Sequence, residues 1–247
     1  NDISEEKKLI QGCQTNDVNI VRLSLKNGAN ISPHLGGLLD LKPLHIISQN
    51  GNIEILKVLM EYSVNVFEKR KFDGASALHL GCANNHFEYC QYLLENCGLK
   101  KYINDRDILY RTPLMDASQC ASYKCIELLI LNGADASLID KHGNSALGYC
   151  LDCDNYDNFI ECSMMLVRNG ANINVLGNFN GQGLLHHLCL MNKLELIKEC
   201  IDKYKGNINI VNINGKLPID YAKHKKYNDI IEYLESKNKT ETKCIIL

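Results

Sequence analysis

Two groups of side chains are candidates for metal chemistry, and neither has the spacing that a metal site requires. The acidic run at 152–157 offers carboxylates, but an EF-hand calcium loop needs an oxygen ligand at its fifth position and glycine at its sixth. This run has Tyr156 and Asp157 there. Cys150 and Cys153 form half of a zinc motif, and no second pair follows at a recognisable spacing. We therefore expect a solvated loop with a core thiol, and neither a metal nor any other cofactor.

Histidine is the other candidate for chemistry. His45, His79 and His186 recur at one position of a repeated sequence pattern. A catalytic histidine would occur once, so this recurrence predicts a framework role. The sequence also lacks a G-x-S-x-G turn, a glycine-rich phosphate loop and an H-E-x-x-H zinc motif. These observations predict that the protein is not an enzyme.

The composition indicates which kind of partner the protein binds and in which cellular compartment it lies. The chain has 12 cysteines and a net charge of −2. A surface that binds nucleic acid normally leaves a strong basic excess, so we expect no nucleic acid partner. The cysteines occupy small or apolar positions of the expected helices, where reduced thiols act as buried hydrophobes. Because reduced thiols persist in the cytosol, we expect a cytoplasmic protein without disulfides.

A repeated unit must position these side chains. One apolar residue recurs at separations of 33 to 38 residues, and each unit reads as a short helix, a longer apolar helix and a turn. Glycines such as Gly133 follow the longer helix, where a left-handed cap is needed. This period is typical of stacked supersecondary units, which place function on an extended surface. The recurring residues are Leu9, Leu44, Leu78, Leu114, Leu147, Leu185 and Ile219.

The pattern resembles the ankyrin repeat. The family's T-P-L-H opening appears almost intact as T-P-L-M at 112–115 and K-P-L-H at 42–45, and its G-H-x-E-[IV]-V middle as G-N-I-E-I-L at 51–56. Its G-A-[DN] end is present at 133–135. The resemblance covers residues 5–236 and implies an all-α fold, an α-solenoid of stacked helix-turn-helix repeats with β-hairpin-like fingers. It also implies that the recurring histidines bond backbone across repeats. The expected repeats are 1–36, 37–70, 71–106, 107–139, 140–177, 178–211 and 212–236, with the end repeats as polar caps and a flexible tail at 237–247.

The resemblance implies a non-catalytic adaptor, a monomer that binds a protein partner across its concave face. We interpret the cations and aromatic residues of the third and fourth fingers either as a patch for an acidic or phosphorylated segment or as ordinary solvated turns. The finger candidates are Arg70, Lys71, Phe72, Tyr110, Arg111, Lys141, His142 and Phe179. The candidates on the first helices are Gln49, Asn50, Asn84 and Gln119.

Departures from the period predict docking loops. A widened finger is expected at 32–40, and about four extra residues lie between the helices of the fifth repeat, within 152–157. Insertions in repeat arrays map to loops, which often contact a partner.

The last four residues, from Cys244 to Leu247, fit a C-a-a-X box whose terminal Leu favours geranylgeranylation. One isoprenoid gives only marginal membrane affinity, so the expected attachment to the cytosolic face of a membrane is peripheral and reversible. The alternative is that these residues begin a membrane span of a larger protein. The array would then be a regulatory or substrate-recruiting domain of an enzyme such as a palmitoyltransferase, or of a channel. In a third reading, Asn65, Asn174 and Asn209 occupy positions that are hydroxylated in the family.

Overall fold

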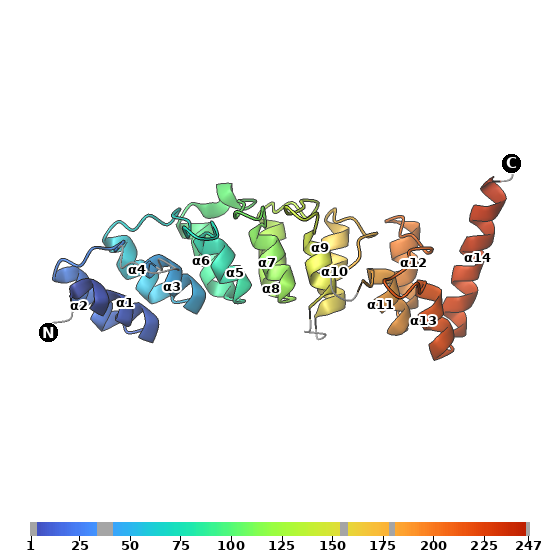
Figure 1. Cartoon of the computed structure of the whole chain (residues 1–247), viewed down its shortest axis with the longest axis horizontal. Coiled ribbons are helices and arrows are strands. Elements are labelled where there is room, and N and C mark those ends of the chain that lie inside the picture. Colours follow the sequence, from blue (N-terminus) through green and yellow to red (C-terminus); the bar gives the residue numbers. More distant parts are fainter. Residues whose placement is uncertain (1–3, 34–41, 154–157, 178–180, 246–247) are drawn as a thin grey trace. The chain divides into compact units, whose positions relative to one another are not determined.

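The computed structural model describes residues 4–33, 42–153, 158–177 and 181–245, and side chains as far as residue 238. These residues form helices joined by turns and no β-strand, so the fold is an all-α solenoid (Figure 1). The fingers are tight turns closed by backbone hydrogen bonds, such as the one from the Arg70 N–H to the Ala75 carbonyl at 2.8 Å. The chain divides into two compact units, unit 1 (1–135 and 139–143) and unit 2 (136–138 and 144–247).

The described residues of unit 1 form four pairs of antiparallel helices, with a short 3-10 turn after the third pair. The elements are α1 (Glu5–Thr15), α2 (Val18–Lys26), α3 (Pro43–Asn50), α4 (Ile53–Glu61), α5 (Ala77–Ala83), α6 (Phe87–Asn96), η1 (Leu99–Tyr102), α7 (Pro113–Gln119) and α8 (Tyr123–Leu131). The first helices of successive pairs pack in the order α1, α3, α5 and α7, and behind them α2 packs on α4 and α6 on α8.

Unit 2 has the same pattern, with three pairs of helices in the part of it that the structure describes. Its helices are α9 (Ala146–Leu151), α10 (Phe159–Arg168), α11 (Leu184–Leu190), α12 (Leu194–Asp202), α13 (Pro218–Lys225) and α14 (Asn228–Ile245). Within this unit α9 packs on α10, α11 on both α12 and α13, and α13 on α14.

Local sequence explains where the short helices begin. Thr112 caps α7 through its hydroxyl, which accepts the Met115 N–H, and Pro113 follows at the first helical position, where no donor is needed. Ser76 caps α5 through its hydroxyl, while the His79 ring accepts the Ser76 N–H in return. The T-P-L-H pattern is therefore a helix-start signal, as the sequence predicts.

The recurring apolar residues lie in the core of each unit. Leu9, Leu44, Leu78, Leu114, Leu147 and Leu185 are buried. Ile219 is only half-buried, which corrects the expectation that all seven anchors are buried. The 11 cysteines whose side chains are described form no disulfide with one another, and all but Cys120 are buried. Burial raises the pKa of Cys13 and Cys189 to about 12, so these thiols act as small hydrophobes.

The C-terminal segment differs from the sequence prediction. We expected a flexible tail at 237–247, but α14 continues to Ile245. Lys237 on this helix pairs with Asp202 of α12 at 2.5 Å, and Tyr233 donates a hydrogen bond to the same carboxylate at 3.1 Å. These contacts hold the start of the extension against its neighbour. No helix in the described part of the chain combines the length and apolar character that a membrane span requires.

Candidate functional site

The turns that lead into the first helix of a repeat are called fingers here. Three of them are each organised around one polar side chain. Asp107 accepts the N–H groups of Leu109 and Arg111 through Oδ1, at 2.9 and 2.8 Å. Asn212 holds its finger in the same way, accepting the N–H groups two and four residues later. Asp140 accepts the His142 N–H at 2.8 Å. Asp and Asn suit this role because their short side chains bond the backbone two residues on.

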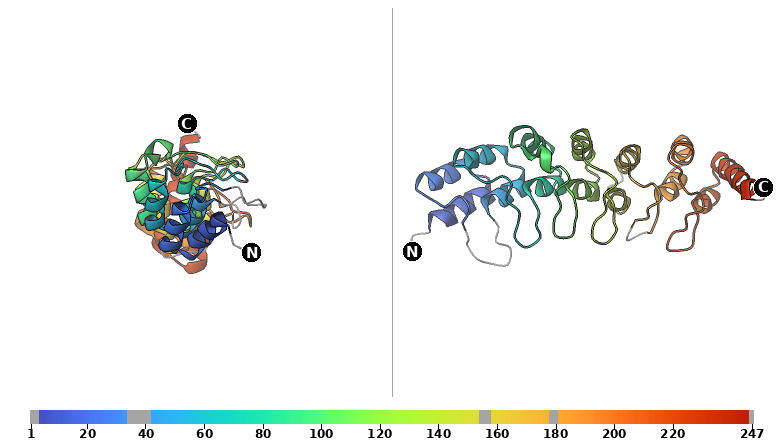
Figure 2. Two further views of the ribbon diagram at one scale, coloured as in Figure 1. Left: turned by 90° about the vertical axis from the view of Figure 1, so that its left-hand side faces the viewer. Right: turned by 90° about the horizontal axis from the view of Figure 1, so that it is seen from above.

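Backbone hydrogen bonds join the neighbouring fingers of unit 1. The Ile108 N–H donates to the Asp73 carbonyl at 2.9 Å, and the Lys141 N–H donates to the Leu109 carbonyl at 2.8 Å. Figure 2 shows these loops projecting from the same side of the helices of unit 1. The tips of three fingers therefore form one connected surface.

Tyr110 occupies a position that glycine fills in two other fingers. Its N–H donates to the Asp107 carbonyl, just as Gly143 donates to Asp140 and Gly215 to Asn212. The glycines have φ values of 84° and 67°, and Tyr110 has φ of 64°. This left-handed conformation costs an L-residue roughly 1–2 kcal/mol. A bulky residue held there is a feature that calls for an explanation.

The side chains around Tyr110 are exposed and apolar or cationic. We define the finger surface as six exposed residues: Lys71, Phe72, Ile108, Tyr110, Ile139 and Lys141. Phe72 is 45% exposed, Ile108 54%, Tyr110 49% and Ile139 53%. The Tyr110 ring has the Arg106 guanidinium 5.5 Å and the Lys141 ammonium 6.0 Å from its centroid. Groups of exposed apolar side chains are a general feature of protein interaction sites.

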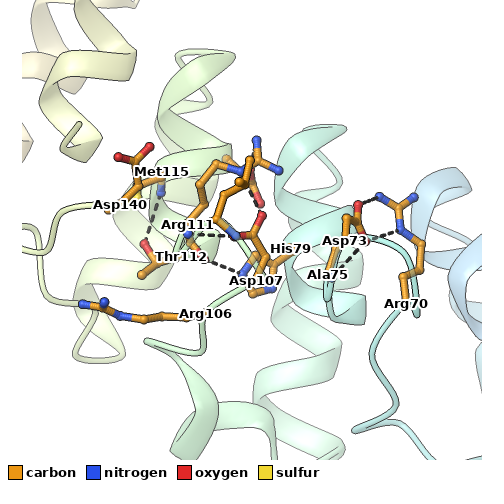
Figure 3. A network of polar contacts seen from close by, with 12 residues as sticks. Arg70, Asp73, Ala75, His79, Arg106, Asp107, Arg111, Thr112, Met115 and Asp140 are labelled. Carbon is orange, nitrogen blue, oxygen red and sulfur yellow. Dashed lines mark hydrogen bonds and ion pairs between the residues drawn. The ribbon is translucent and has the colours of Figure 1, made fainter. Parts of the chain in front are cut away.

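A polar network beneath this surface engages two of the predicted arginines (Figure 3). Arg70 pairs with Asp73, with Nε donating at 3.0 Å, and its guanidinium lies 4.7 Å from the Phe72 ring centroid. Arg111 lies between two acids, 2.9 Å from Asp107 and 3.4 Å from Asp116. Arg70 and Arg111 therefore position the fingers, whereas Lys71, Phe72 and Tyr110 present exposed side chains.

Asp116 carries an unusual carboxyl group in this network. It is buried in the first turn of α7. Burial raises its pKa to about 7, and this effect outweighs the attraction of Arg111, while Asp107 and Asp73 raise the pKa further. Transfer out of water disfavours the charged form, so Asp116 titrates near neutral pH.

The recurring histidines hold the turns, as the sequence predicts. His79 Nε2 lies 3.0 Å from the Arg111 carbonyl, His186 Nε2 3.0 Å from the Lys216 carbonyl, and His45 Nε2 3.4 Å from the Glu68 carbonyl. Burial lowers the pKa of all three rings. A neutral ring that bonds a carbonyl needs no charge, so each imidazole donates to the backbone of a finger.

The candidates on the first helices do not join the finger surface. The fingers lead into the start of α3, α5 and α7, whereas Gln49, Asn50, Asn84 and Gln119 lie at the far ends of these helices. A helix of seven or eight residues separates the two groups by about 11 Å. Asn50 is also engaged, because its amide donates to the Cys13 carbonyl at 3.1 Å. The finger candidates and the first-helix candidates therefore lie at opposite ends of these helices and do not form one site.

Other predicted features lie outside the described residues. Phe179 belongs to 178–180, most of the widened finger to 34–41 and most of the acidic insert to 154–157. Among the described candidates, His142 follows Lys141 in its finger and is also exposed. In the parts that the structure describes, no group of three or more His, Cys, Asp or Glu is arranged to hold a metal ion.

Sequence reasoning missed Ile108, Ile139 and the meaning of Tyr110. The signal was available in the spacing: D-x-x-G at 140–143 and N-x-x-G at 212–215 align with D-x-x-Y at 107–110. That alignment shows a tyrosine where the turn favours glycine. The exposure of Ile108 and Ile139 follows from the turn geometry and has no simple sequence pattern.

Comparisons with known proteins agree with this architecture. The ankyrin repeat family matches at residues 9–107 as three consecutive copies, and single ankyrin repeats match at 110–141 and 180–210.

Three relatives show how widely such repeats occur. The chain is 31% identical over 153 residues to an ankyrin repeat protein of Acanthamoeba polyphaga mimivirus, a match that covers 53% of this chain. It is 28% identical, over 61% of its length, to the target of rapamycin complex 2 subunit AVO2 of Saccharomyces cerevisiae. It is 27% identical, over 76% of its length, to the human transient receptor potential cation channel subfamily A member 1. The matches span 26%, 34% and 14% of these relatives, so each is much longer than the shared region.

Proposed function

The chain carries ankyrin repeats, and from that premise we propose that it is a non-catalytic adaptor whose finger surface binds a protein partner. The yeast relative is a subunit of a protein complex, which supports an interaction role. The position of Tyr110 is the observation that carries the proposal. The chain bears the strain of a left-handed tyrosine, and the side chain gains little burial in return because about half of it faces solvent.

The charges of the finger surface favour an acidic partner segment. Lys71, Lys141 and Arg106 are exposed, whereas Asp107 and Asp140 are buried beneath them and accept backbone hydrogen bonds. A partner therefore meets cations beside aromatic and aliphatic side chains. Aromatic and basic residues in such settings often contribute most of the binding energy. We expect a segment that combines carboxylate or phosphate groups with apolar side chains.

Affinity capture tests the proposal with matched variants. The test variant combines Phe72→Ser, Tyr110→Gly and Lys141→Gln. The control combines Leu23→Ser, Leu131→Ser and Lys26→Gln, which make the same kinds of change at exposed positions of α2 and α8. We expect the test variant to lose at least about tenfold of the captured partner relative to wild type, equivalent to about 1.4 kcal/mol. The proposal fails if both variants retain the same proteins in the same amounts.

We propose in addition that Cys244 receives a geranylgeranyl group, provided that Leu247 is the terminal residue of the protein in the cell. The C-a-a-X spacing is the only support for this modification. It would give a cytoplasmic adaptor peripheral membrane attachment. The rival proposal is that the repeats recruit substrates or regulate activity within a larger enzyme or channel. The mass of the intact native protein separates the two, because a much longer polypeptide is incompatible with lipidation at residue 244.

A further inference from the structure

A groove lies in unit 2 between α11 and α13, and no residue of the finger surface lines it. The two helices pack side by side (Figure 1). The groove has a volume of about 450 Å³ and is lined by Leu190, Lys216, Asp220, Tyr221, His224 and Lys225. Ligand pockets of proteins typically measure roughly 300–1,000 Å³, so the groove is large enough to enclose a large side chain.

The apolar part of the groove is held in a fixed position. The Tyr221 ring packs edge-on against the His186 ring, with centroids 5.7 Å apart. The Tyr221 hydroxyl accepts a hydrogen bond from the Asn212 amide at 2.8 Å. Because a phenol both donates and accepts, this bond leaves the hydroxyl proton available to a further acceptor. Leu190, at the end of α11, is the aliphatic residue of the lining.

The rim of the groove is cationic. Lys216, His224 and Lys225 are exposed, and among the described residues neither lysine has a carboxylate within ion-pair distance. The acid in the lining, Asp220, is already engaged, because its Oδ2 accepts the Leu217 N–H at 2.9 Å. Nearby Lys223 is partly neutralised by Glu235 of α14, 3.5 Å away. The positive charge of the rim is therefore available to an external anion.

We propose that this groove is a second binding site, which takes a short acidic protein segment with one aromatic side chain. The aromatic side chain fills the space between Leu190 and Tyr221. Carboxylates on either side of it face Lys216 and Lys225 and accept the Tyr221 hydroxyl proton. Opposite charges at a rim raise the association rate and select the partner, while the enclosed apolar contact supplies affinity.

A peptide fits this site better than an anionic membrane surface does. The two exposed lysines would attract both. A bilayer surface would leave the apolar groove unfilled, whereas a peptide side chain fills it. The shape of the groove therefore favours a peptide over a membrane surface. The experiment must test whether a side chain fills the groove.

Fluorescence anisotropy with labelled peptides provides the test. The probe is fluorescein-Glu-Asp-Phe-Glu-Asp, and the comparison peptides replace Phe by Gly or the four acids by Gln and Asn. We expect the whole chain to bind the probe and each comparison peptide to bind at least about fivefold more weakly, a loss of roughly 1 kcal/mol. Vesicles of phosphatidylcholine with phosphatidylserine, added without calcium, are the membrane arm.

Two variants of the whole chain assign the site. Lys216→Gln with Lys225→Gln removes the cations of the rim, and Leu190→Ser opens the apolar wall. The matched control is Lys193→Gln with Lys198→Gln, which removes the same charge from the α12 region of unit 2. Lys216, Lys225 and Lys193 are exposed, and Lys198 is half-buried and pairs with Glu195 of its own helix. Circular dichroism should show unchanged helix content in both double variants. We expect weaker probe binding in both groove variants and wild-type binding in the control.

Three outcomes would overturn the inference. The probe could bind with the same affinity to the double groove variant as to the control. The Phe-to-Gly peptide could bind as well as the probe, which would reduce the site to non-specific charge attraction. Alternatively, the vesicles could bind and the probe fail to bind. Since none of the substituted residues belongs to the finger surface, each of these outcomes leaves the proposal for unit 1 standing.

Discussion

Substitution of Tyr110 distinguishes a role in partner binding from a role in stabilising the fold of unit 1. Its backbone is in the left-handed region, where Gly143 and Gly215 stand in the equivalent turns. We predict that Tyr110→Gly leaves the free energy of unfolding unchanged or raises it by up to about 1 kcal/mol, because glycine has no steric cost there. Urea unfolding measures the change.

Tyr110→Ala is the control for this prediction. Alanine loses the ring and keeps the backbone strain, so it should be less stable than Tyr110→Gly by about 1 kcal/mol. If Tyr110→Gly is instead destabilised by more than about 1 kcal/mol, the ring stabilises the fold and its exposure has no functional meaning.

The buried carboxyl group of Asp116 should make the free energy of unfolding depend on pH. Its pKa is about 7 in the folded chain against an ordinary value of 3.8. A raised pKa means that the carboxyl contributes its full stability below pH 3.8 and loses it progressively as pH rises to about 7. Asp116→Asn stays neutral throughout. We therefore predict that the variant is more stable than wild type at pH 8 by roughly 1–3 kcal/mol, at about 1.4 kcal/mol per pKa unit and with allowance for Arg111.

The same comparison at pH 4.5 provides the control for Asp116. Most of the stability difference between variant and wild type should disappear there, because the wild-type carboxyl is protonated in the folded state. Equal differences at pH 4.5 and pH 8, measured by urea unfolding, would show that Asp116 does not titrate near neutral pH.

The finger built on Asp107 is the element that presents Tyr110. Its carboxylate accepts the N–H groups of Leu109 and Arg111 and the Arg111 Nε. We predict that Asp107→Ala destabilises unit 1 by about 2 kcal/mol, because three part-buried donors lose their acceptor. Amide hydrogen exchange at 107–111 should become faster, and partner binding should weaken.

Asp107→Asn is the matched variant for the finger. It retains Oδ1 as an acceptor and loses only the charge, so its exchange should lie between those of wild type and Asp107→Ala. Unchanged exchange at 107–111 in the Ala variant would contradict the claim that this side chain builds the finger.

Most of the elements could be predicted from the sequence because their signals are local. The Pro113 position, the caps at Ser76 and Thr112 and the buried Leu114 each depend on neighbours within one helical turn.

Features that depend on contacts between distant residues were missed. From its residue type, Arg111 is a candidate for partner binding. Its ion pairs with Asp107 and Asp116 make it a residue that positions the finger instead. The polar segment after Ser236 looked like a tail, yet Lys237 anchors it to Asp202. Such contacts override local propensity and cannot be read from composition.

At the scale of the whole molecule, the chain presents one proposed surface in each unit. The finger surface is a connected set of turns in unit 1, and the groove between α11 and α13 belongs to unit 2. In a solenoid, each repeat contacts mainly its neighbours. Substitutions in one unit should therefore leave binding at the other intact, which allows the two sites to be tested separately within one full-length chain.

Site-specific photo-cross-linking tests the claim that unit 1 binds a protein through its fingers. The photoreactive residue p-benzoylphenylalanine is introduced as Tyr110→p-benzoylphenylalanine or, in a matched chain, as Leu131→p-benzoylphenylalanine. Leu131 is 78% exposed at the end of α8 in the same unit. We predict that illumination of cells expressing each chain yields a discrete cross-linked protein from position 110 and none from position 131. Cross-links from position 131 alone, or the same proteins from both positions, would contradict the account.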